Sequence, residues 1–245
     1  MGLAVVTVPR SRSGPLMFGM AGSKIFMATK KHEILEQLED GLKGAKFRIL
    51  NEVLYRKTDK NMNAELFKKY HEGFEHQVRK WPFNPLSAVI SQVNKLDAKL
   101  VIADLGCGTG ELGRKFNTRK VYSFDLVRPE GKSDVIEADI RNIPLGNASV
   151  DIAICCLSLM GENAAPYVTE AHRILKPGGL FKVAEIRSRL LKIDSFVSPM
   201  AIHGFQLLRK DLESNFFCFF DFKKTDPKSK HLPPIPLKPC VYKKR

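Results

Sequence analysis

The stretch Met62–Trp81 carries apolar residues at three- and four-residue steps, namely Phe67, Tyr70, Phe74, Val78 and Trp81. Residues at that spacing share one face of a helix, and an apolar face is typical of a helix that packs on a core. The stretch therefore predicts a helix with one buried face, inside a region whose pattern favours helix from residue 33 to residue 95.

Prolines mark the end of this helix and the start of the next one. The residue before a proline is pushed out of the α region, so Trp81-Pro82 is expected to end the first helix. Asn84-Pro85 has the residues typical of an N-cap followed by proline at the first helical position. We therefore predict a second helix over Leu86–Val93.

From Lys99 onward the pattern changes to short, continuous apolar runs that are rich in β-branched residues. The five runs are Leu100–Leu105, Val121–Leu126, Val135–Ala138, Val150–Leu157 and Leu180–Ile186. Polar or glycine-rich turns end each run, which is typical of strands, and helical stretches separate the runs. Buried strands joined by helical crossovers favour a parallel sheet with helices on both faces.

Two further apolar runs follow a helix that is predicted around Ile193–His203. The runs Phe205–Leu212 and Phe216–Phe222 are joined by a short connection, which favours an antiparallel pair at one edge of the sheet. The predicted fold class is therefore α/β, with a doubly wound, seven-stranded, Rossmann-like sheet over residues 96–226. An N-terminal helical cap over residues 32–95 is expected to precede this sheet.

Basic residues are concentrated at both ends of the chain. Residues 1–32 hold five Lys or Arg and no acid, and residues 223–245 hold eight Lys or Arg against Asp226, so the two ends account for +12 of the net charge of +14. Basic ends favour a polyanionic partner such as nucleic acid, because each neutralised phosphate releases a counterion. Solvated tails that are basic only for solubility are the alternative.

The two end segments have no regular pattern of apolar residues. Residues 1–31 are expected to be a disordered or targeting extension, or sequence upstream of a start at Met27. Residues 227–245 contain five prolines, which predicts a basic proline-rich tail without a regular helix.

No apolar run reaches the roughly 18 residues of a membrane-spanning helix, so no membrane partner is expected. Five cysteines without a C-x-x-C pair indicate reduced thiols in an intracellular protein and no metal site.

The most specific chemical motif is Asp104-Leu-Gly-Cys-Gly-Thr-Gly110, directly after the first predicted strand. Small residues let the backbone approach a ligand closely, and the N-terminus of a helix follows. A dinucleotide-binding loop would have its third glycine where Glu111 stands, and an acid there would repel a pyrophosphate. The spacing therefore favours S-adenosylmethionine, a sulfonium cofactor without phosphate, over a nicotinamide cofactor. A seven-stranded sheet that ends in an antiparallel pair is also typical of methyltransferases.

Acidic residues follow the next two strands. Asp125 ends the second strand, where a carboxylate can accept hydrogen bonds from ribose hydroxyls, although a helix cap is the alternative. Asp139 follows the third strand and suits the exocyclic amine of adenine, with the backbone N–H of Ile140 facing a ring nitrogen. Cys156 at the end of the fourth strand either lines the cofactor cleft or is an ordinary core cysteine.

From about Glu33 onward the chain resembles the nucleolar ribosomal-RNA-processing methyltransferases, whose animal member is called nucleomethylin. The glycine loop and the lysine-proline-glycine turn occur in many methyltransferases, whereas the N-terminal and C-terminal stretches are more specific. The resemblance rests on Gly44–Tyr55, Tyr70–Phe74, Lys80–Pro82, the glycine loop, Cys156–Gly161, Leu175–Leu180, Lys182–Glu185 and Lys238–Arg245.

The resemblance implies methylation of adenine N1 in large-subunit ribosomal RNA, a role in ribosomal RNA processing and a nuclear, nucleolar location. It implies cofactor contacts at His71, Gly106, Asp125, Asp139, Ile140 and Cys156. His71 on its own would be taken as a surface or core histidine. The animal members also imply chromatin-silencing partners and methylated histone H3, so a cofactor-binding module that recruits histone-modifying proteins is the alternative function. No catalytic base is predicted, because the N1 nitrogen of neutral adenine already bears a lone pair.

Overall fold

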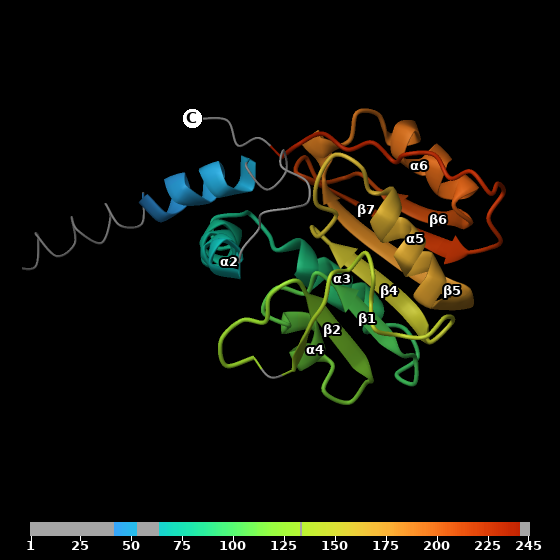
Figure 1. The fold of residues 1–245 in the computed structure, drawn as a ribbon, viewed down its shortest axis with the longest axis horizontal. Helices are drawn as coiled ribbons and strands as arrows, with labels where there is room; N and C mark the ends of the chain where they lie inside the picture. Colours follow the sequence, from blue (N-terminus) through green and yellow to red (C-terminus); the bar gives the residue numbers. More distant parts are fainter. Residues whose placement is uncertain (1–41, 53–63, 133, 241–245) are drawn as a thin grey trace, which may run out of the picture. The chain divides into compact units, whose positions relative to one another are not determined.

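The computed structural model describes residues 42–52, 64–132 and 134–240. Its centre is one seven-stranded sheet with the strand order β3-β2-β1-β4-β5-β7-β6 (Figure 1). The strands are β1 Ile102–Leu105, β2 Val121–Asp125, β3 Val135–Glu137, β4 Val150–Cys156, β5 Leu175–Ile186, β6 Phe205–Asp211 and β7 Phe217–Lys224. Strands β1 to β5 are parallel, and β7 runs antiparallel to both β5 and β6. The predicted fold class and the predicted antiparallel pair at one edge are confirmed.

Helices cover both faces of this sheet. They are α2 Ala64–Val78, α3 Pro85–Val93, α4 Glu111–Lys115, α5 Ala165–Ile174 and α6 Ile193–Ile202, and residues 42–52 are also helical. One apolar core joins α5 and α6 to the sheet, and a second joins α3 and α4 to the opposite face. A third, smaller cluster of Phe47, Phe67 and Tyr70 packs helix 42–52 against α2. The sequence pattern predicts this two-faced covering because its strands are apolar on both sides.

The turn between α2 and α3 differs from the prediction at one end. Helix α2 ends at Val78, three residues before Trp81, and the chain tightens into a turn in which the Trp81 N–H donates to the Val78 carbonyl at 3.1 Å. The start of α3 is as predicted: the Asn84 side chain accepts a hydrogen bond from the Leu86 N–H at 3.0 Å, and Pro85 occupies the first turn. This turn places Trp81 beside the site described below.

Strand β5 begins at Leu175, five residues earlier than predicted. A lysine-proline-glycine segment is typical of a stop between a helix and a strand. Instead Leu175 pairs with Val150, and a register shift between Val150 and Ile152 takes up the extra residues before Leu180 pairs with Ile152. A bulge of this kind lets the irregular segment remain in the sheet. The strand therefore begins before the lysine-proline-glycine segment and not after it.

The described residues from Lys43 onward form one compact unit, and the predicted boundaries at residues 95 and 226 fall inside it. Helix α3 packs on the sheet, and the proline-rich segment packs on the α5–α6 side through the buried side chains of Ile235 and Leu237. The Ala164 N–H donates to the Ile235 carbonyl at 2.9 Å. Residues 235–240 of the predicted basic proline-rich tail therefore pack against the rest of this unit. The predicted extension over residues 1–31 lies outside the described residues.

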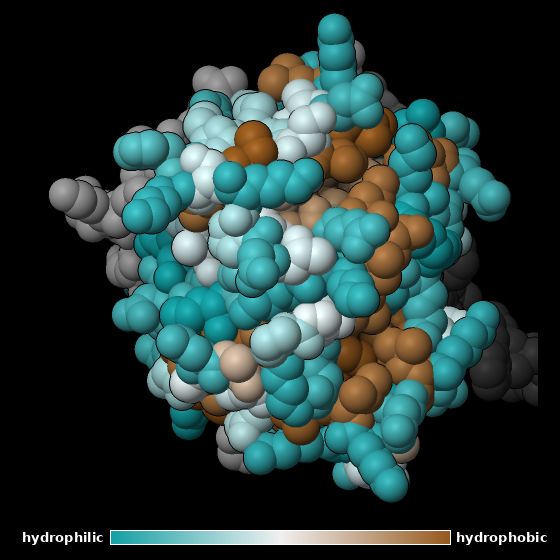
Figure 2. Space-filling model, turned by 90° about the vertical axis from the view of Figure 1, so that its right-hand side faces the viewer, coloured by the Kyte–Doolittle hydropathy of each residue, from teal (hydrophilic) through white to brown (hydrophobic). Residues whose placement is uncertain are grey.

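The surface of this unit mixes polar and apolar areas. Figure 2 shows the face at the right of Figure 1, where hydrophobic residues gather in a band between hydrophilic ones. Within the described part of the chain, none of the helices combines the length and apolar character needed to cross a membrane.

Candidate active site

A cavity of about 640 Å³ lies where the carboxyl ends of β1, β2 and β4 meet the helical cap. Crevices at the carboxyl ends of parallel strands are the usual ligand sites of doubly wound sheets. The six residues for which the family resemblance implies cofactor contacts all line this cavity: His71, Gly106, Asp125, Asp139, Ile140 and Cys156. Tertiary folding thus brings together side chains that are up to 85 residues apart in the sequence.

The glycine loop forms the floor of this cavity, and Gly106 is required there for two reasons. Its φ is +77°, and a Cβ at this position would lie 2.3 Å from the Ser158 Cβ. The N–H groups of Gly106 and Cys107 donate to the Phe124 carbonyl at 2.8 and 2.9 Å, which ties the loop to the end of β2. Apart from its chain neighbours, none of the described residues has an atom within 4 Å of the place that a Cβ of Gly108 (φ +57°) would take, so this side is open to a ligand.

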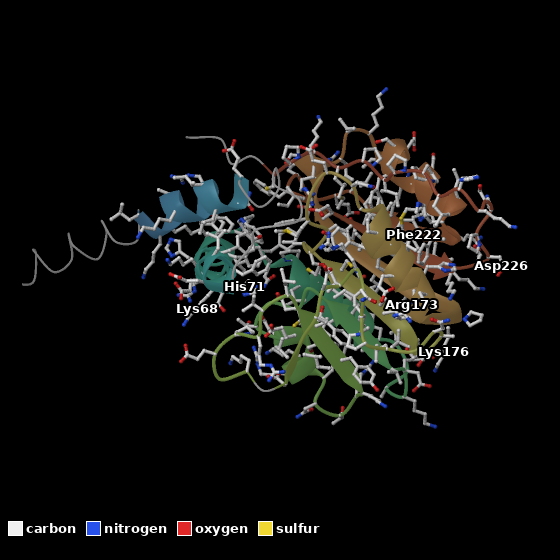
Figure 3. The ribbon with its side chains drawn as sticks, in the orientation of Figure 1. Lys68, His71, Arg173, Lys176, Phe222 and Asp226 are labelled. Carbon is white, nitrogen blue, oxygen red and sulfur yellow. The ribbon has the colours of Figure 1, made fainter. Side chains whose placement is uncertain are left out.

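Asp125 connects three segments at the end of β2. Its Oδ2 accepts the Gly108 N–H at 2.7 Å, and its Oδ1 accepts the Leu126 N–H at 2.9 Å. The Nε2 atom of His71 lies 3.4 Å from the same Oδ1, so α2 meets the sheet at this carboxylate. Figure 3 shows His71 and Lys68 projecting from α2. The histidine that only the family resemblance selects is therefore part of the cavity wall.

Asp139 is paired within the protein. The Nε and Nη2 atoms of Arg141 donate to its carboxylate at 3.0 and 2.7 Å, and the Arg141 N–H donates at 2.9 Å. Partial burial opposes ionisation, but these three donors hold the pKa of Asp139 below its usual value. The carboxylate is therefore an anion with fixed orientation beside Ile140. Arg141 also lines the cavity, and sequence reasoning missed it.

Asp104, at the end of β1, is the second residue that sequence reasoning missed. Its residue surface is 3% exposed, and no hydrogen bond from the described residues reaches its carboxylate. Burial, with a smaller contribution from the nearby Asp125, raises its pKa to about 7. A buried carboxylate without a cation is costly in the free protein, so this position favours a positively charged ligand group. The sequence feature that could have identified Asp104 as a site residue is its position as the first residue of the glycine motif.

The cysteine at the end of β4 is not an activated nucleophile. Cys156 lines the cavity, but burial and the carboxylates of Asp104 and Glu185 raise the pKa of its thiol well above the usual range. A neutral thiol is a poor nucleophile, so its role is that of an apolar wall. No cluster of three or more potential metal ligands occurs among the residues that the structure describes.

The opposite wall of the cavity comes from α2 and from the turn that follows it. This wall is largely aromatic and apolar, with Glu75, Arg79 and Asn84 as its polar members beside His71. The cavity therefore has two different walls: strand ends that carry carboxylates and a helical wall that carries aromatic rings. Two walls of different chemistry can hold two different ligands next to each other.

Comparisons with known proteins agree with this geometry. A family model described as a hypothetical methyltransferase matches residues 33–245. Ribosomal RNA-processing protein 8 of Dictyostelium discoideum is 38% identical over 92% of this chain and 63% of its own length. The 25S rRNA (adenine(645)-N(1))-methyltransferase of Schizosaccharomyces pombe is 40% identical over 89% of this chain and 74% of its own length. The chain thus spans less than two thirds of the Dictyostelium relative.

The fold also matches solved methyltransferase structures. The 1,6-didemethyltoxoflavin-N1-methyltransferase of Burkholderia thailandensis, solved with S-adenosylhomocysteine, aligns with a TM-score of 0.55 over 69% of this chain and 94% of that one, at 18% identity. That similarity concerns the fold alone. The family model matches residues 33–245, and the two relatives at 38% and 40% identity align with 92% and 89% of this chain. The chain belongs to the methyltransferase family that includes these ribosomal RNA-processing proteins.

Proposed function

We propose that this chain is an S-adenosylmethionine-dependent methyltransferase that methylates N1 of an adenine in large-subunit ribosomal RNA. The observation that carries the cofactor assignment is the buried carboxylate of Asp104 beside the glycine loop. A ligand with a cationic amino-acid end compensates this carboxylate, whereas the pyrophosphate of a dinucleotide would meet Asp104, Glu111 and Asp125. The charges of the cavity therefore fit a sulfonium nucleoside better than a dinucleotide.

Each lining residue then has a role that matches its chemistry. Asp104 holds the α-ammonium group, and Asp125 accepts hydrogen bonds from the ribose hydroxyls. Asp139, held by Arg141, faces the exocyclic amine of the cofactor's adenine, and the Ile140 N–H faces a ring nitrogen. Gly106 and Gly108 let the backbone come close to the ligand, Cys156 forms apolar wall, and His71 holds α2 against Asp125.

The reaction needs alignment more than it needs proton transfer. The bound cofactor supplies a methyl group on a positively charged sulfur. The N1 nitrogen of neutral adenine has a free lone pair, so the protein's task is to hold that nitrogen in line with the methyl carbon and to keep water out. Positioning of this kind accelerates a transfer greatly without any catalytic base. The target base must be unpaired, because N1 lies on the Watson–Crick edge.

The RNA substrate and the nucleolar location are proposed from two observations. The names of the relatives refer to ribosomal RNA processing and, for the Schizosaccharomyces pombe protein, to adenine N1 of 25S rRNA. The chain also carries a net charge of +14, concentrated at its ends, which suits a polyanion. Both observations favour RNA over the alternative of a chromatin-silencing module that binds methylated histone H3.

The product can be tested by primer extension. A methyl group at N1 blocks base pairing, so reverse transcriptase stalls one nucleotide before the modified adenine. Large-subunit RNA from cells that lack the protein should lose one such stall, and the wild-type chain should restore it while Asp125→Ala should not. A stall that persists without the protein contradicts the proposal. Transfer of labelled methyl groups to RNA without any stall would indicate another position, such as N6.

A further inference from the structure

The helical wall of the cavity carries three polar side chains in one row. His71 and Glu75 on α2 and Arg79 directly after its end follow each other at four-residue steps, and all three line the cavity. Each step is close to one helical turn, or about 5.4 Å along the axis. His71 contacts Asp125 at the end of β2, where the cofactor is proposed to bind. Glu75 and Arg79 therefore lie progressively farther from the strand ends, toward the turn before α3. This end of the cavity has no role in the cofactor contacts described above.

Glu75 is the carboxylate that α2 contributes to the cavity. Its side chain is 47% exposed, and its Oε2 lies 3.9 Å from Arg79 Nη2, a weak ion pair in which the arginine is 77% exposed. The other acidic groups of the cavity come from strand ends and from the start of α4. The carboxylate of Glu75 can therefore still accept a hydrogen bond from a second ligand that enters the cavity.

Trp81 supplies a flat ring at the same end of the cavity. It is the single tryptophan of the chain, is half-buried and lines the cavity. Its ring centroid lies 5.8 Å from that of Phe74 and 5.0 Å from that of Phe217, in edge-to-face contacts. Rings fixed in this way are suitable stacking surfaces for a nucleobase taken out of its helix.

We propose that Glu75 and Trp81 form the subsite for the target adenine, with Trp81 stacking on the base and Glu75 accepting a hydrogen bond from its N6 amino group. This inference rests on the proposed function. As N1 forms its bond to the methyl carbon, the bond between that carbon and sulfur breaks with its electrons left on sulfur. The positive charge thereby passes to the adenine ring and its amino group. A carboxylate at N6 stabilises that developing charge and holds the base in line.

The same contact explains the choice of base. Adenine presents an amino donor at position 6, whereas hypoxanthine and guanine present a carbonyl oxygen there. A carboxylate attracts the donor and repels the oxygen, so Glu75 favours adenine by attraction and excludes the other purines by repulsion. A glutamine at this position would accept from the amino group or donate to the carbonyl, and the preference would be lost.

The fluorescence of Trp81 provides a direct test, because no other tryptophan contributes to the signal. The full chain, saturated with S-adenosylhomocysteine, is titrated with a short oligouridine that carries one central adenosine or, in a second titration, one central inosine. The adenosine oligonucleotide should quench the emission and bind about tenfold more tightly than the inosine one. Glu75→Gln should bring the two affinities within about twofold of each other.

Glu72→Gln is the matched control, since it removes the same charge from an exposed position on α2 that does not line the cavity. It should keep the preference for adenosine, and all three proteins should bind S-adenosylhomocysteine equally. A wild-type protein without any preference, an unquenched Trp81 or equal preferences in Glu75→Gln and Glu72→Gln would overturn the subsite. If Glu75→Gln loses S-adenosylhomocysteine binding, Glu75→Asp replaces it and should reduce the preference in part.

A single-turnover assay separates this inference from the proposed function. If the wild-type chain methylates no adenine N1 in any RNA, the proposed function itself is wrong. If the wild-type chain methylates N1, and Glu75→Gln does so at the same rate and with the same KM, only the subsite is wrong. The expected result is a rate of methyl transfer at saturating RNA that falls about tenfold or more in Glu75→Gln and is unchanged in Glu72→Gln.

Discussion

The Nε2 atom of His71 lies 3.4 Å from the Oδ1 atom of Asp125, and both side chains are largely buried, at 14% and 6% exposed. This contact joins α2 of the helical cap to the end of β2. Because the other oxygen of Asp125 accepts the Gly108 N–H, one carboxylate orients both the cap and the glycine loop around the cavity. Asp125 therefore positions the cap and the glycine loop in addition to its proposed hydrogen bonds to the cofactor.

Asp125→Ala is expected to weaken the binding of S-adenosylmethionine. The variant removes a charged acceptor worth roughly 1.5–3 kcal/mol, which corresponds to about tenfold to over a hundredfold in affinity. Calorimetric titration with S-adenosylmethionine measures the change. Asp134→Ala, a half-exposed carboxylate with a weak contact to Arg114, is the control and should bind normally. Equal affinities in the two variants, or tight binding of a nicotinamide dinucleotide by the wild type, would refute the assigned role.

Cofactor affinity should depend on pH through Asp104. Its pKa of about 7 in the free protein means that the carboxyl group is mostly neutral at about pH 6 and mostly charged at about pH 8. Since the ammonium group of the cofactor prefers the charged form, affinity should rise about tenfold over that interval. Titrations of Asp104→Asn should show weaker binding with little pH dependence. A wild-type protein whose affinity is flat across pH 6–8 would contradict this assignment.

The same group has the opposite effect on the stability of the free protein. An acid whose pKa rises from 3.8 to about 7 on folding binds more protons in the folded state, so stability falls as pH rises between those values. Without cofactor, Asp104→Asn should therefore raise the melting temperature relative to wild type above about pH 7 and have little effect near about pH 4. The stabilisation should disappear when S-adenosylmethionine is present, because the wild-type carboxylate then has a partner.

Gly106→Ala should be strongly destabilising. The left-handed φ costs roughly 1–2 kcal/mol for any residue with a Cβ, and the new methyl group would also overlap the Ser158 Cβ. Thermal unfolding measures the loss, with Gly131→Ala as the control, since its φ of +71° imposes a similar strain in open space. Adding Ser158→Gly should recover part of the stability of Gly106→Ala. No recovery in the double variant would show that overlap with Ser158 is not the cause.

Two truncations should separate packing from RNA binding in the C-terminal segment. Deletion of residues 235–245 removes the buried side chains of Ile235 and Leu237 and the Lys238 carbonyl that accepts from Arg189, so it should lower the melting temperature markedly. Deletion of residues 243–245 should keep stability and flatten the salt dependence of RNA binding by up to about two units of slope. Replacing those three residues by glutamine should give the same slope. If the salt dependence of RNA binding has the same slope in these variants as in the wild type, residues 243–245 do not contact phosphates.

The sequence by itself determined the strands, the cap of α3 and the glycine loop. These features depend on local rules: continuous apolar runs, the Asn84-Pro85 pair and the spacing of Gly106, Gly108 and Gly110 each report the conformation of neighbouring residues. Asp125 and Asp139 follow successive strands in the sequence, and both line the cavity. They lie together because parallel strands bring their carboxyl ends to the same edge.

Only the tertiary structure decided which carboxylates are buried and what covers them. Asp104 and Asp139 both stand near strand ends in the sequence, but folding buries Asp104 without a hydrogen bond from the described residues to its carboxylate, whereas Asp139 pairs with Arg141 two residues along the chain. The C-terminal segment has the composition of a free basic tail, yet Ile235 finds an apolar surface made by α5, α6 and the sheet. Burial depends on residues far away in the chain, and composition or periodicity within one segment carries no information about it.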